Sequence, residues 1–465
     1  MKYISTRGRA PSLGFVDVLL AGLAPDGGLY VPGQWPQLSP EQLRAMRGQS
    51  YADVAFTVLH PFVGGEIDDA ALKQMIDEAY GTFAHKAVVP LKQLDANQWL
   101  MELFHGPTLA FKDVAMQLLA RLMDHALARS GRRATIVGAT SGDTGGAAIE
   151  AFSNSTRTDI FILHPHGRVS DVQRRQMTTV GKDNVHNIAL EGNFDDCQAH
   201  VKAMFSDAQF RDQVLLSGVN SINWARIMAQ TVYYFTTALA LGGPDRPVSY
   251  SVPTGNFGDI FAGQVARHMG LPIKDLVIAT NVNDILHRTL QTSRYEVLGV
   301  EATQSPSMDI QVSSNFERLL FEAAGKDAEE VGRLMDNLKQ SGAFTLSEPM
   351  RNYIRAGFSS GRTDEAGTAS TIRQTLAETG ELLDPHTAVG YAVARQLAEP
   401  GVPMITLATA HPAKFPDAVE SASGVRPGLP QRMGDLMDRK EVFDVLPNSL
   451  EEVKTYIASR TQAAG

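Results

Sequence analysis

The sequence predicts an α/β protein with doubly wound, largely parallel sheets. Three observations lead to this class. From about residue 96 onward, short β-branched runs alternate with longer amphipathic stretches, several of the runs are almost continuously apolar, and two of them lead into glycine-rich loops that open helices. Continuous apolar runs are typical of strands covered by helices on both faces. Strand–helix alternation favours parallel pairing.

The elements follow in order along the chain. Residues 1–95 are broken by turn signals such as PDGG and PGQWPQLSP, and helical patterns around 40–58 and 68–83 predict a small, mainly helical unit. The region 300–398 is mostly helical and polar, and we expect a helical insertion there. The runs that predict strands are 134–140, 159–165, 185–192, 213–220, 248–252, 275–280 and 403–409.

These elements suggest three domains, since 465 residues exceed one ordinary core. We expect an N-terminal domain at 1–95. A small α/β domain is expected at 132–235. A large α/β domain would combine 96–131 with 236–465 and carry the insertion.

Composition narrows the class of function. Lys and Arg number 42 against 51 Asp and Glu, a net charge of −9, which argues against nucleic acid as a partner. No apolar run reaches signal-peptide or membrane-span length, so we expect a cytoplasmic protein without membrane contact. The single cysteine, Cys197, excludes an intrachain disulfide and is interpreted as a small, partly buried residue. Without an HExxH motif or a Cys/His cluster, no metal site is predicted.

Lys112 is the first candidate site residue. In FHGPTLAFKDVAMQ it lies between Phe111 and Asp113, where a helical apolar pattern begins and Asp113 could be the N-cap. The helix dipole and burial beside Phe111 would both lower the pKa of the amine, and a lysine nucleophile must be neutral to attack a carbonyl. A solvated lysine with its stem over Phe111 is the alternative.

Two glycine-rich loops are candidate anion sites. GATSGDTGGAAIEAF follows the run 134–140, and PTGNFGDIFAGQVARHMG follows 248–252. Glycines expose backbone N–H groups, and a following helix adds positive potential, which favours phosphate or carboxylate. Neither loop matches G-x-G-x-x-G or contains G-K-[ST], so the dinucleotide and nucleoside-triphosphate fingerprints are absent. Two loops at strand ends favour a ligand in a crevice between them.

A third anion site is suggested by NSINWARIMAQ. If Asn223 is the N-cap, Arg226 lies in the first turn, where the dipole disfavours a cation by about 0.3–1 kcal/mol. An anion bound by Arg226, Asn220 and Ser221 would reverse that penalty, whereas an ordinary salt bridge is the alternative. The last predicted strand ends at Thr409, whose hydroxyl could meet a ligand ring.

Several of these segments together resemble one family. HGPTLAFKD, TSGDTG, NSINWAR, PTGNFGD and ATAHPAKF are similar to segments of threonine synthases, which are pyridoxal-phosphate enzymes of fold type II, the tryptophan-synthase-β-like fold. YISTRG and GLAPDGGLYVP resemble the N-terminal domain of the same enzymes. The likeness spans nearly the whole chain and points to the long form with a helical insertion.

The resemblance implies roles for individual residues. Lys112 would hold pyridoxal 5'-phosphate as a Schiff base, and Thr409 would form a hydrogen bond with the pyridine nitrogen of this cofactor. Arg226, with Asn220 and Ser221, would bind the substrate's phosphate. The residues that would cradle the cofactor phosphate are Gly255, Asn256, Phe257, Gly258 and Asp259. Those that would meet the substrate carboxylate and the face of the cofactor are Ser141, Gly142, Asp143 and Thr144.

Asp143 departs from the family pattern. Many relatives carry an asparagine near the cofactor's ring oxygen, and an ionised Asp143 there would repel a phenolate. Asp143 would therefore be protonated, or turned to another donor.

The implied reaction converts O-phospho-L-homoserine and water to L-threonine and phosphate, in a monomer or homodimer. AFKD alone would also suit a serine/threonine dehydratase-like lyase, which would not need a phosphate site at Arg226. A catalytically silent metabolite-binding protein on the same fold is a further alternative, against which the presence of Lys112 argues. A dinucleotide oxidoreductase is disfavoured because its fingerprint is missing.

Overall fold

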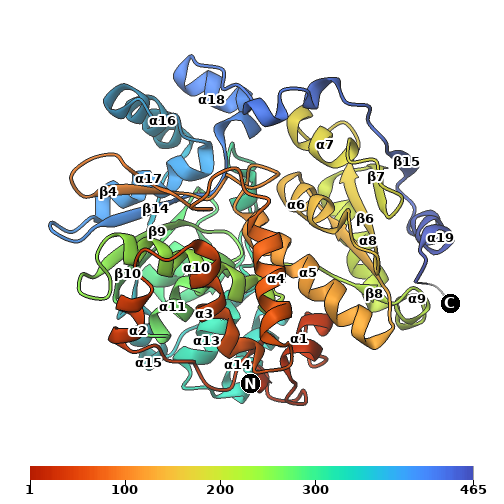
Figure 1. The fold of residues 1–465 in the computed structure, drawn as a ribbon, viewed down its shortest axis with the longest axis horizontal. Coiled ribbons are helices and arrows are strands. Elements are labelled where there is room, and N and C mark those ends of the chain that lie inside the picture. The colour runs from red at the N-terminus through yellow and green to blue at the C-terminus, as the bar shows by residue number, and fades with distance from the viewer. Residues whose placement is uncertain (464–465) are drawn as a thin grey trace.

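Two β-sheets form the centres of two lobes in the computed structural model, which describes residues 1–463 (Figure 1). The strand order of the larger sheet is β13 (Phe358–Arg362), β10 (Ile273–Thr280), β9 (Val248–Pro253), β14 (Met404–Ala408), β4 (Gln98–Glu102) and β3 (Leu91–Gln93). Strand β3 is antiparallel to β4, and all other neighbouring strands are parallel. The smaller sheet is parallel throughout, with the order β15 (Asp444–Pro447), β7 (Val185–Glu191), β6 (Thr158–Pro165), β5 (Ala134–Ala139) and β8 (Leu216–Ser217). The predicted α/β class is confirmed.

Central strands are buried along their whole length because helices cover both faces. Every residue of β6, β9 and β14 is buried, which explains their continuous apolar runs. In the large lobe, α17 (Pro385–Leu397) packs on β9, β10 and β14, while α11 (Gly258–His268) packs on β10 and on α10 (Trp224–Ala240). In the small lobe, α6 (Asp143–Phe152) and α8 (Phe194–Ser206) pack on β6.

The N-terminal segment packs against the helices of the large lobe. It contains the hairpin β1 (Tyr3–Ser5)–β2 (Tyr30–Pro32) and the helices α1 (Phe15–Ala21), α2 (Pro40–Ala45), α3 (Tyr51–Val63) and α4 (Asp69–Tyr80). Helix α3 contacts α10, and α4 contacts α5 (Lys112–Ser130). These contacts place the N-terminal helices against α5 and α10, the two helices that carry Lys112 and Arg226 (Figure 1).

The insertion expected at 300–398 is not purely helical. It follows α12 (Ile285–Thr292) and β11 (Arg294–Glu296) and contains a short 3₁₀ helix η1 (Pro306–Met308), helices α13 (Phe316–Ala323), α14 (Ala328–Ser341), α15 (Glu348–Arg355) and α16 (Glu365–Thr379), and strands β12 (Ala343–Thr345) and β13. Strand β13 is the edge of the large sheet, paired with β10. Its sequence FSSGR is half-exposed and polar, so it lacks the apolar signal of a central strand.

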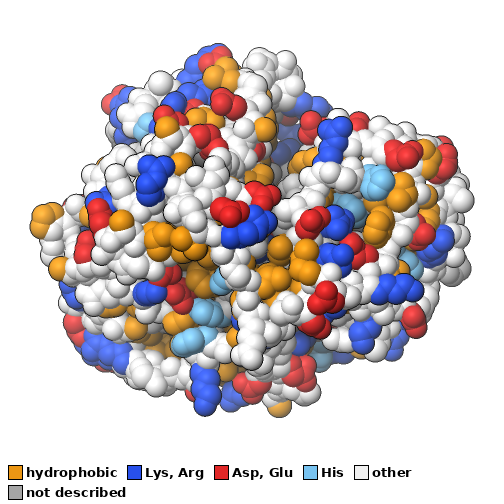
Figure 2. All heavy atoms as spheres, turned by 90° about the horizontal axis from the view of Figure 1, so that it is seen from above, with side chains coloured by type: hydrophobic (Ala, Val, Ile, Leu, Met, Phe, Trp, Pro, Cys, Tyr) orange, Lys and Arg blue, Asp and Glu red, His pale blue; other side chains and the backbone are white. Residues whose placement is uncertain are grey.

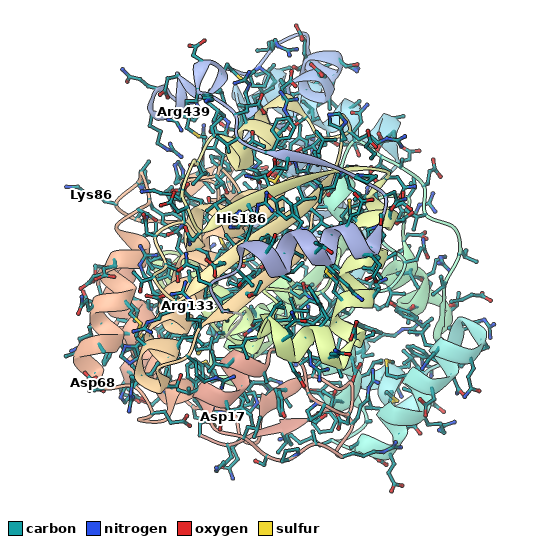
Figure 3. The ribbon with its side chains drawn as sticks, turned by 90° about the vertical axis from the view of Figure 1, so that its right-hand side faces the viewer. Asp17, Asp68, Lys86, Arg133, His186 and Arg439 are labelled. Atoms are coloured by element: carbon teal, nitrogen blue, oxygen red, sulfur yellow. The ribbon has the colours of Figure 1, made fainter. Side chains whose placement is uncertain are left out.

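The C-terminal segment corrects the expected domain boundaries. Residues 236–465 were assigned to the large domain, but β15 pairs with β7, so the chain returns to the small sheet. Helix α19 (Leu450–Arg460) then crosses the outer side of that sheet close to His186 (Figure 3). The His186 ring stacks on Phe161 with centroids 4.4 Å apart and lies edge-on to Tyr456 of α19 at 6.4 Å. Strand β15 is short and largely exposed, so its partner depends on tertiary packing.

The surface carries charge of both signs. Figure 2 shows Lys and Arg side chains interspersed with Asp and Glu over the face seen from above. Within residues 1–463, no helix is both long and apolar enough to cross a membrane. Cys197 is buried, and burial raises the pKa of its thiol to about 12.

Candidate active site

Lys112 is the first residue of α5. The helix has Phe111 at its N-cap position, without a side-chain cap. The expected capping role of Asp113 is wrong, because its carboxylate turns back to Thr108, accepting hydrogen bonds from the backbone N–H at 2.8 Å and from the hydroxyl at 2.6 Å. Asp113 therefore shapes the turn that precedes Lys112 rather than closing the helix end.

The amine of Lys112 is buried rather than solvated. The residue is 8% exposed, and its Nζ lies 4.7 Å from the centroid of the Phe111 ring and 3.6 Å from Oδ2 of Asp143. Burial lowers the pKa of the Lys112 amine, the nearby charges of Lys414 and Arg226 lower it further, and Asp143 opposes them. This environment favours the neutral amine that nucleophilic chemistry requires.

Backbone hydrogen bonds bring Thr409 next to Lys112. The N–H of Phe111 donates to the carbonyl of Thr409 at 2.8 Å, and the N–H of His411 donates to the carbonyl of Leu109 at 3.0 Å. The segment before α5 is thus joined to the segment after β14. The Thr409 N–H is held by the hydroxyl of Thr387 at 3.2 Å, so the position of Thr409 is fixed from two sides.

The loop after β9 presents free backbone amides. The backbone N–H groups of residues 255–258 donate to no acceptor within residues 1–463. The last of these residues, Gly258, is the first residue of α11. The carbonyls are occupied instead: Gly255 O accepts from the Ser313 hydroxyl at 2.6 Å, and Asn256 O accepts from the Asn315 N–H at 3.0 Å. Phe257 adopts the left-handed conformation, φ 64°, which turns the chain into the helix. Such a turn is suited to bind an anion.

Asp259 is part of this loop, but its side chain points to α10. Its Oδ1 accepts hydrogen bonds from the hydroxyls of Tyr233 at 2.5 Å and Tyr234 at 3.1 Å. Burial raises the pKa of Asp259 to about 6, although the tyrosine hydrogen bonds oppose it. Asp259 therefore anchors the first turn of α11, and its carboxylate is committed to the tyrosines.

The raised pKa of Asp259 makes a prediction about stability. A carboxyl with a folded pKa of about 6 contributes stability that is present below its unfolded pKa and is lost as pH rises through about 6. Asp259→Asn cannot ionise, so its Tm relative to the parent protein should rise by about 2–4 °C between about pH 4 and pH 7. Thermal unfolding monitored by circular dichroism measures this, with exposed Asp212→Asn as control. A pH-independent difference between Asp259→Asn and the parent contradicts it.

The loop after β5 is held by Thr140. Its hydroxyl accepts from the N–H groups of Gly142 and Gly145, both at 2.9 Å. Gly142 has φ 146°, and a Cβ there would lie 2.5 Å from the Gln173 side chain, so glycine is required. Ser141 is exposed and Thr144 half-buried, at the start of α6.

Asp143 is ionised and bound to a second lysine. Its Oδ1 lies 2.9 Å from the Nζ of Lys414 and accepts from the Gln173 amide at 2.9 Å. Burial opposes ionisation, but the charges of Lys414 and Lys112 hold the pKa of Asp143 well below its usual range. Asp143 was expected to be either protonated or turned to another donor, and the structure shows it turned to Lys414 and Gln173.

Arg226 is a buried cation for which residues 1–463 provide no carboxylate partner. Asn223 is the N-cap of α10, as predicted, accepting from the Ala225 N–H at 3.0 Å. Arg226 is 3% exposed, its Nη1 donates to Val219 O at 3.0 Å, and its Nε has no acceptor. No described carboxylate lies within 4.0 Å, so the alternative of an ordinary salt bridge is wrong. Burial lowers the pKa of Arg226 to about 10, and an anion would relieve that cost.

The Arg226 site adjoins the loop after β9. A Cβ on Gly258 would lie 3.7 Å from the carbonyl of Ser221 and 3.4 Å from Cδ1 of Ile227. Asn220 is exposed and Ser221 half-buried at the turn before α10. The structure thus brings two of the three predicted anion sites, the loop after β9 and the Arg226 site, side by side.

Three further residues lie at the site. Lys414, in the 3₁₀ helix η2 (Pro412–Lys414), is fully buried and donates to the carbonyl of Thr108 at 2.7 Å. His386 accepts from the Ser307 N–H at 3.2 Å and contacts Asp384 at 2.9 Å. The Ser307 hydroxyl lies 3.5 Å from Asp143. The sequence signal that could have indicated His386 is DPHT, residues 384–387, in which the N-cap Asp384 is followed by an ionisable side chain.

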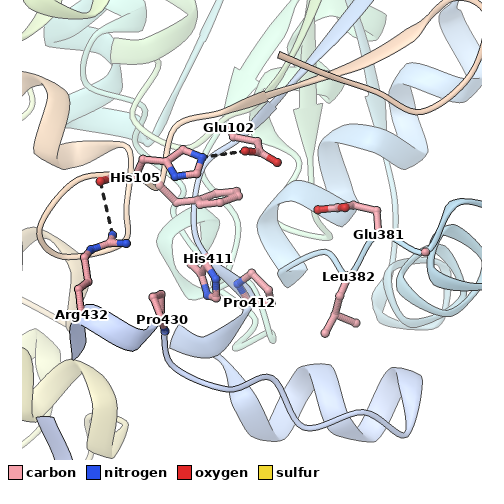
Figure 4. A pocket seen from close by; sticks show the side chains of 10 residues that line it. Glu102, His105, Glu381, Leu382, His411, Pro412, Pro430 and Arg432 are labelled. Carbon is pink, nitrogen blue, oxygen red and sulfur yellow. Dashed lines mark hydrogen bonds and ion pairs between the residues drawn. The ribbon is translucent and has the colours of Figure 1, made fainter. Parts of the chain in front are cut away.

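A separate cavity of about 440 Å³ opens at the end of β4 (Figure 4). It is lined by Glu102, Phe104, His105, Gly380, Glu381, Leu382, His411, Pro412, Pro430 and Arg432. His105 contacts Glu102 at 2.7 Å, and Arg432 donates to the carbonyl of Gly106 at 3.0 Å. The predicted site residues do not line this cavity, although His411 follows Thr409 closely.

The residues present fit one kind of cofactor. A buried lysine of lowered pKa follows the segment bonded to Thr409, and the turn 255–258 presents backbone amides that bind no acceptor among the described residues; these features suit a molecule with a carbonyl and a phosphate. Among the described residues, no group of three or more His, Cys, Asp or Glu could hold a metal ion.

Comparison with known proteins first defines the class of enzyme. Residues 84–403 match the family described as Pyridoxal-phosphate dependent enzyme, and fold and site agree with that class. Residues 2–80 match Threonine synthase N terminus, and 387–457 match Threonine synthase, C-terminal. The chain belongs to the threonine synthase family.

Individual relatives extend over the full length. A threonine synthase from Pseudomonas aeruginosa is 56% identical over 460 residues, 98% of each chain. The structure of a pyridoxal-phosphate-bound threonine synthase from Brucella melitensis superimposes with TM-score 0.98 at 64% identity, covering 99% of this chain and 100% of that one. The yeast threonine synthase structure has TM-score 0.94 at 40% identity, covering 99% and 98%.

Proposed function

We propose that this chain, with pyridoxal 5'-phosphate, converts O-phospho-L-homoserine and water into L-threonine and phosphate. Family membership supports the reaction class. The observation that carries the substrate assignment is Arg226, a buried guanidinium with an unsatisfied Nε and no described carboxylate partner. A buried charge of this kind requires an anion, and a phosphorylated substrate provides one.

The residues that hold the cofactor are Lys112, Thr409 and the loop 255–259. Lys112 is the covalent anchor, and the free amides of 255–258 bind the phosphate at the N-terminus of α11. Asp259 supports this turn through the tyrosines of α10. When bound, the cofactor supplies an electron sink for negative charge at the substrate's Cα.

The chain's own groups perform the proton transfers and the binding. Released from its covalent bond when the substrate binds, the neutral amine of Lys112 takes one proton from Cα and one from Cβ. It returns one proton to Cγ after phosphate has left and one to Cα after water has added at Cβ. Arg226, Asn220 and Ser221 hold the phosphate, which leaves from Cγ. Ser141 and Thr144 offer hydrogen-bond donors for the substrate carboxylate at the start of α6, whereas the N–H of Gly142 already donates to the Thr140 hydroxyl and shapes the loop. Asp143, held by Lys414, stabilises positive charge on Lys112 after it accepts a proton.

Replacement of Arg226 tests the substrate. Arg226→Gln should lower kcat/KM for O-phospho-L-homoserine by about 10²- to 10³-fold, because a charge-assisted phosphate contact is lost. The measurement is release of phosphate and formation of threonine in equal amounts, with and without added cofactor. The control is Arg246→Gln, an exposed arginine before β9. Unchanged turnover in Arg226→Gln would favour a serine/threonine dehydratase-like lyase, detected as 2-oxo acid formed from serine or threonine.

We also infer a cytoplasmic enzyme that is a monomer or homodimer. The single cysteine fits a reducing compartment, and the moderate net charge of −9 fits a small-molecule substrate rather than nucleic acid.

A further inference from the structure

We propose that Ser313–Arg318, which lead into α13 and form its first turn, are a positioning element that orients both phosphate-binding loops, with Asn315 and Arg318 as its positioning residues. The proposal rests on the proposed function for the identity of the two anions. It assigns a role in ligand binding to part of the insertion at 300–398.

Ser313 and Asn315 contact the cofactor loop. The Ser313 hydroxyl donates to Gly255 O at 2.6 Å, while both the N–H and the side-chain amide of Asn315 donate to Asn256 O at 3.0 Å. In a planar trans peptide the N–H points opposite to the C=O. Holding the carbonyls of Gly255 and Asn256 on the α13 side therefore directs the N–H groups of Asn256 and Phe257 to the other side, where a phosphate would lie.

The same residues hold the loop before Arg226. The Asn315 amide also donates to Ser221 O at 3.3 Å, and Nη2 of Arg318 donates to Ile222 O at 2.7 Å. By the same peptide geometry, these bonds set the direction of the amides that follow each carbonyl. One asparagine side chain thus contacts both loops, which lie against each other at Gly258 and Ser221.

Arg318 fixes the orientation of Asn315. Its Nη1 donates to Oδ1 of Asn315, which leaves the amide nitrogen directed to the loops. Arg318 also donates to Tyr30 O, from Nε at 3.1 Å and Nη2 at 3.0 Å, so the N-terminal hairpin supports it. The guanidinium and Asn315 are completely buried, which makes this arrangement rigid.

Arg318 adds charge as well as geometry. No described carboxylate lies within 4.0 Å of it, because the neighbouring Glu317 binds Arg7 at 3.0 Å and Thr6 at 2.6 Å instead. Burial lowers the pKa of Arg318 to about 9, a cost that a nearby anion reduces. Its positive potential is therefore available to both loops.

Asn315→Asp tests the positioning role. The variant keeps the size, the backbone N–H and an oxygen for Arg318, but it loses the donor to both loops and places a negative charge beside them. We expect the Kd of pyridoxal phosphate, the KM for O-phospho-L-homoserine and the inhibition constant of inorganic phosphate each to rise about tenfold or more, with kcat changed less than about threefold. Asn352→Asp, an exposed position on α15, is the control with the same chemical change.

Ser313→Ala provides a second variant that removes one hydrogen bond. Because Ser313 contacts the cofactor loop at Gly255 O, its loss should raise the Kd of pyridoxal phosphate several-fold and leave the inhibition constant of inorganic phosphate unchanged. This asymmetry is not expected of general destabilisation. It also keeps the proposal testable if Asn315→Asp does not fold. Equal binding constants in both variants and the parent protein would overturn the proposal, as would a fall in kcat alone.

The binding measurements separate this proposal from the proposed function. Fluorescence titration of the apoprotein with pyridoxal phosphate reports on the cofactor loop without turnover. A parent protein that binds pyridoxal phosphate but does not convert O-phospho-L-homoserine would refute the substrate assignment. The effect of Ser313→Ala on cofactor affinity would still test the positioning of the loop.

Discussion

Replacement of Lys112 by alanine is expected to lower kcat by at least about 10⁴-fold, the largest effect of any single change at the site. Lys112 carries a buried amine 3.6 Å from Oδ2 of Asp143, and the proposed function uses it both as covalent anchor and as proton carrier. Loss of the amine removes both roles at once. Turnover of O-phospho-L-homoserine and the visible absorbance of protein-bound pyridoxal phosphate after gel filtration are the two measurements.

Lys112→Arg separates charge from chemistry. Arginine keeps a cation opposite Asp143 but does not become neutral, so this variant should be as inactive as Lys112→Ala while retaining more stability. Exposed Lys182→Ala is the matched control and should retain parent activity. A Lys112→Ala protein that keeps the cofactor absorbance and turns over within tenfold of the parent would refute the anchor.

Breaking the pair between Asp143 and Lys414 is expected to have the second largest effect, on stability. Both side chains are buried, 2.9 Å apart, and they join η2 to the first turn of α6. Asp143→Asn leaves the ammonium of Lys414 without its counter-ion, and Lys414→Met leaves the carboxylate without its nearer cation. Each single change should lower the free energy of unfolding by about 3–5 kcal/mol.

The double variant Asp143→Asn/Lys414→Met provides the test. The double variant leaves neither charge of the pair uncompensated. Its free energy of unfolding should therefore fall by less than the sum of the decreases in the two single variants. Urea unfolding of the four proteins gives the coupling, and Arg294→Met, which breaks the exposed pair with Glu296, is the control. Additive losses would show that the two charges do not depend on each other.

The same pair has a defined pH dependence. The pKa of Asp143 is lowered in the folded protein, so its contribution is complete above the unfolded value of about 4 and is lost as pH falls below it. The stability advantage of the parent protein over Asp143→Asn should therefore be constant at neutral pH and shrink under acid conditions. An advantage that grows as pH falls would contradict the ionised state of Asp143.

Much of the site could be predicted from local sequence patterns. Asn223 as N-cap, Arg226 in the first turn and the glycine loop after β9 are properties of contiguous residues, and the structure has them where the patterns indicated. Lys112 at a helix entrance was likewise visible, although the helix starts one residue before the expected cap. Capping and helix-dipole arguments depend on neighbours in sequence, which explains their success.

Residues that act across the chain could not be found in this way. Lys414 contacts Thr108 and Asp143, more than 250 residues away in each case, and Asn315 contacts two loops that precede it by 59 and 94 residues. None of these pairings has a periodic or compositional signal. The edge strands β13 and β15 are missed for a related reason, since half-exposed strands lack a continuous apolar run.

The amino-acid order thus accounts for the α/β class, the helix entrances and the family, because hydrophobic period, capping residues and short motifs are local. The ionised state of Asp143, the unpaired charge of Arg226 and the common support of both loops by α13 depend on the folded chain. Burial and the meeting of distant charges set those properties, and both arise when the two sheets and the N-terminal hairpin pack together.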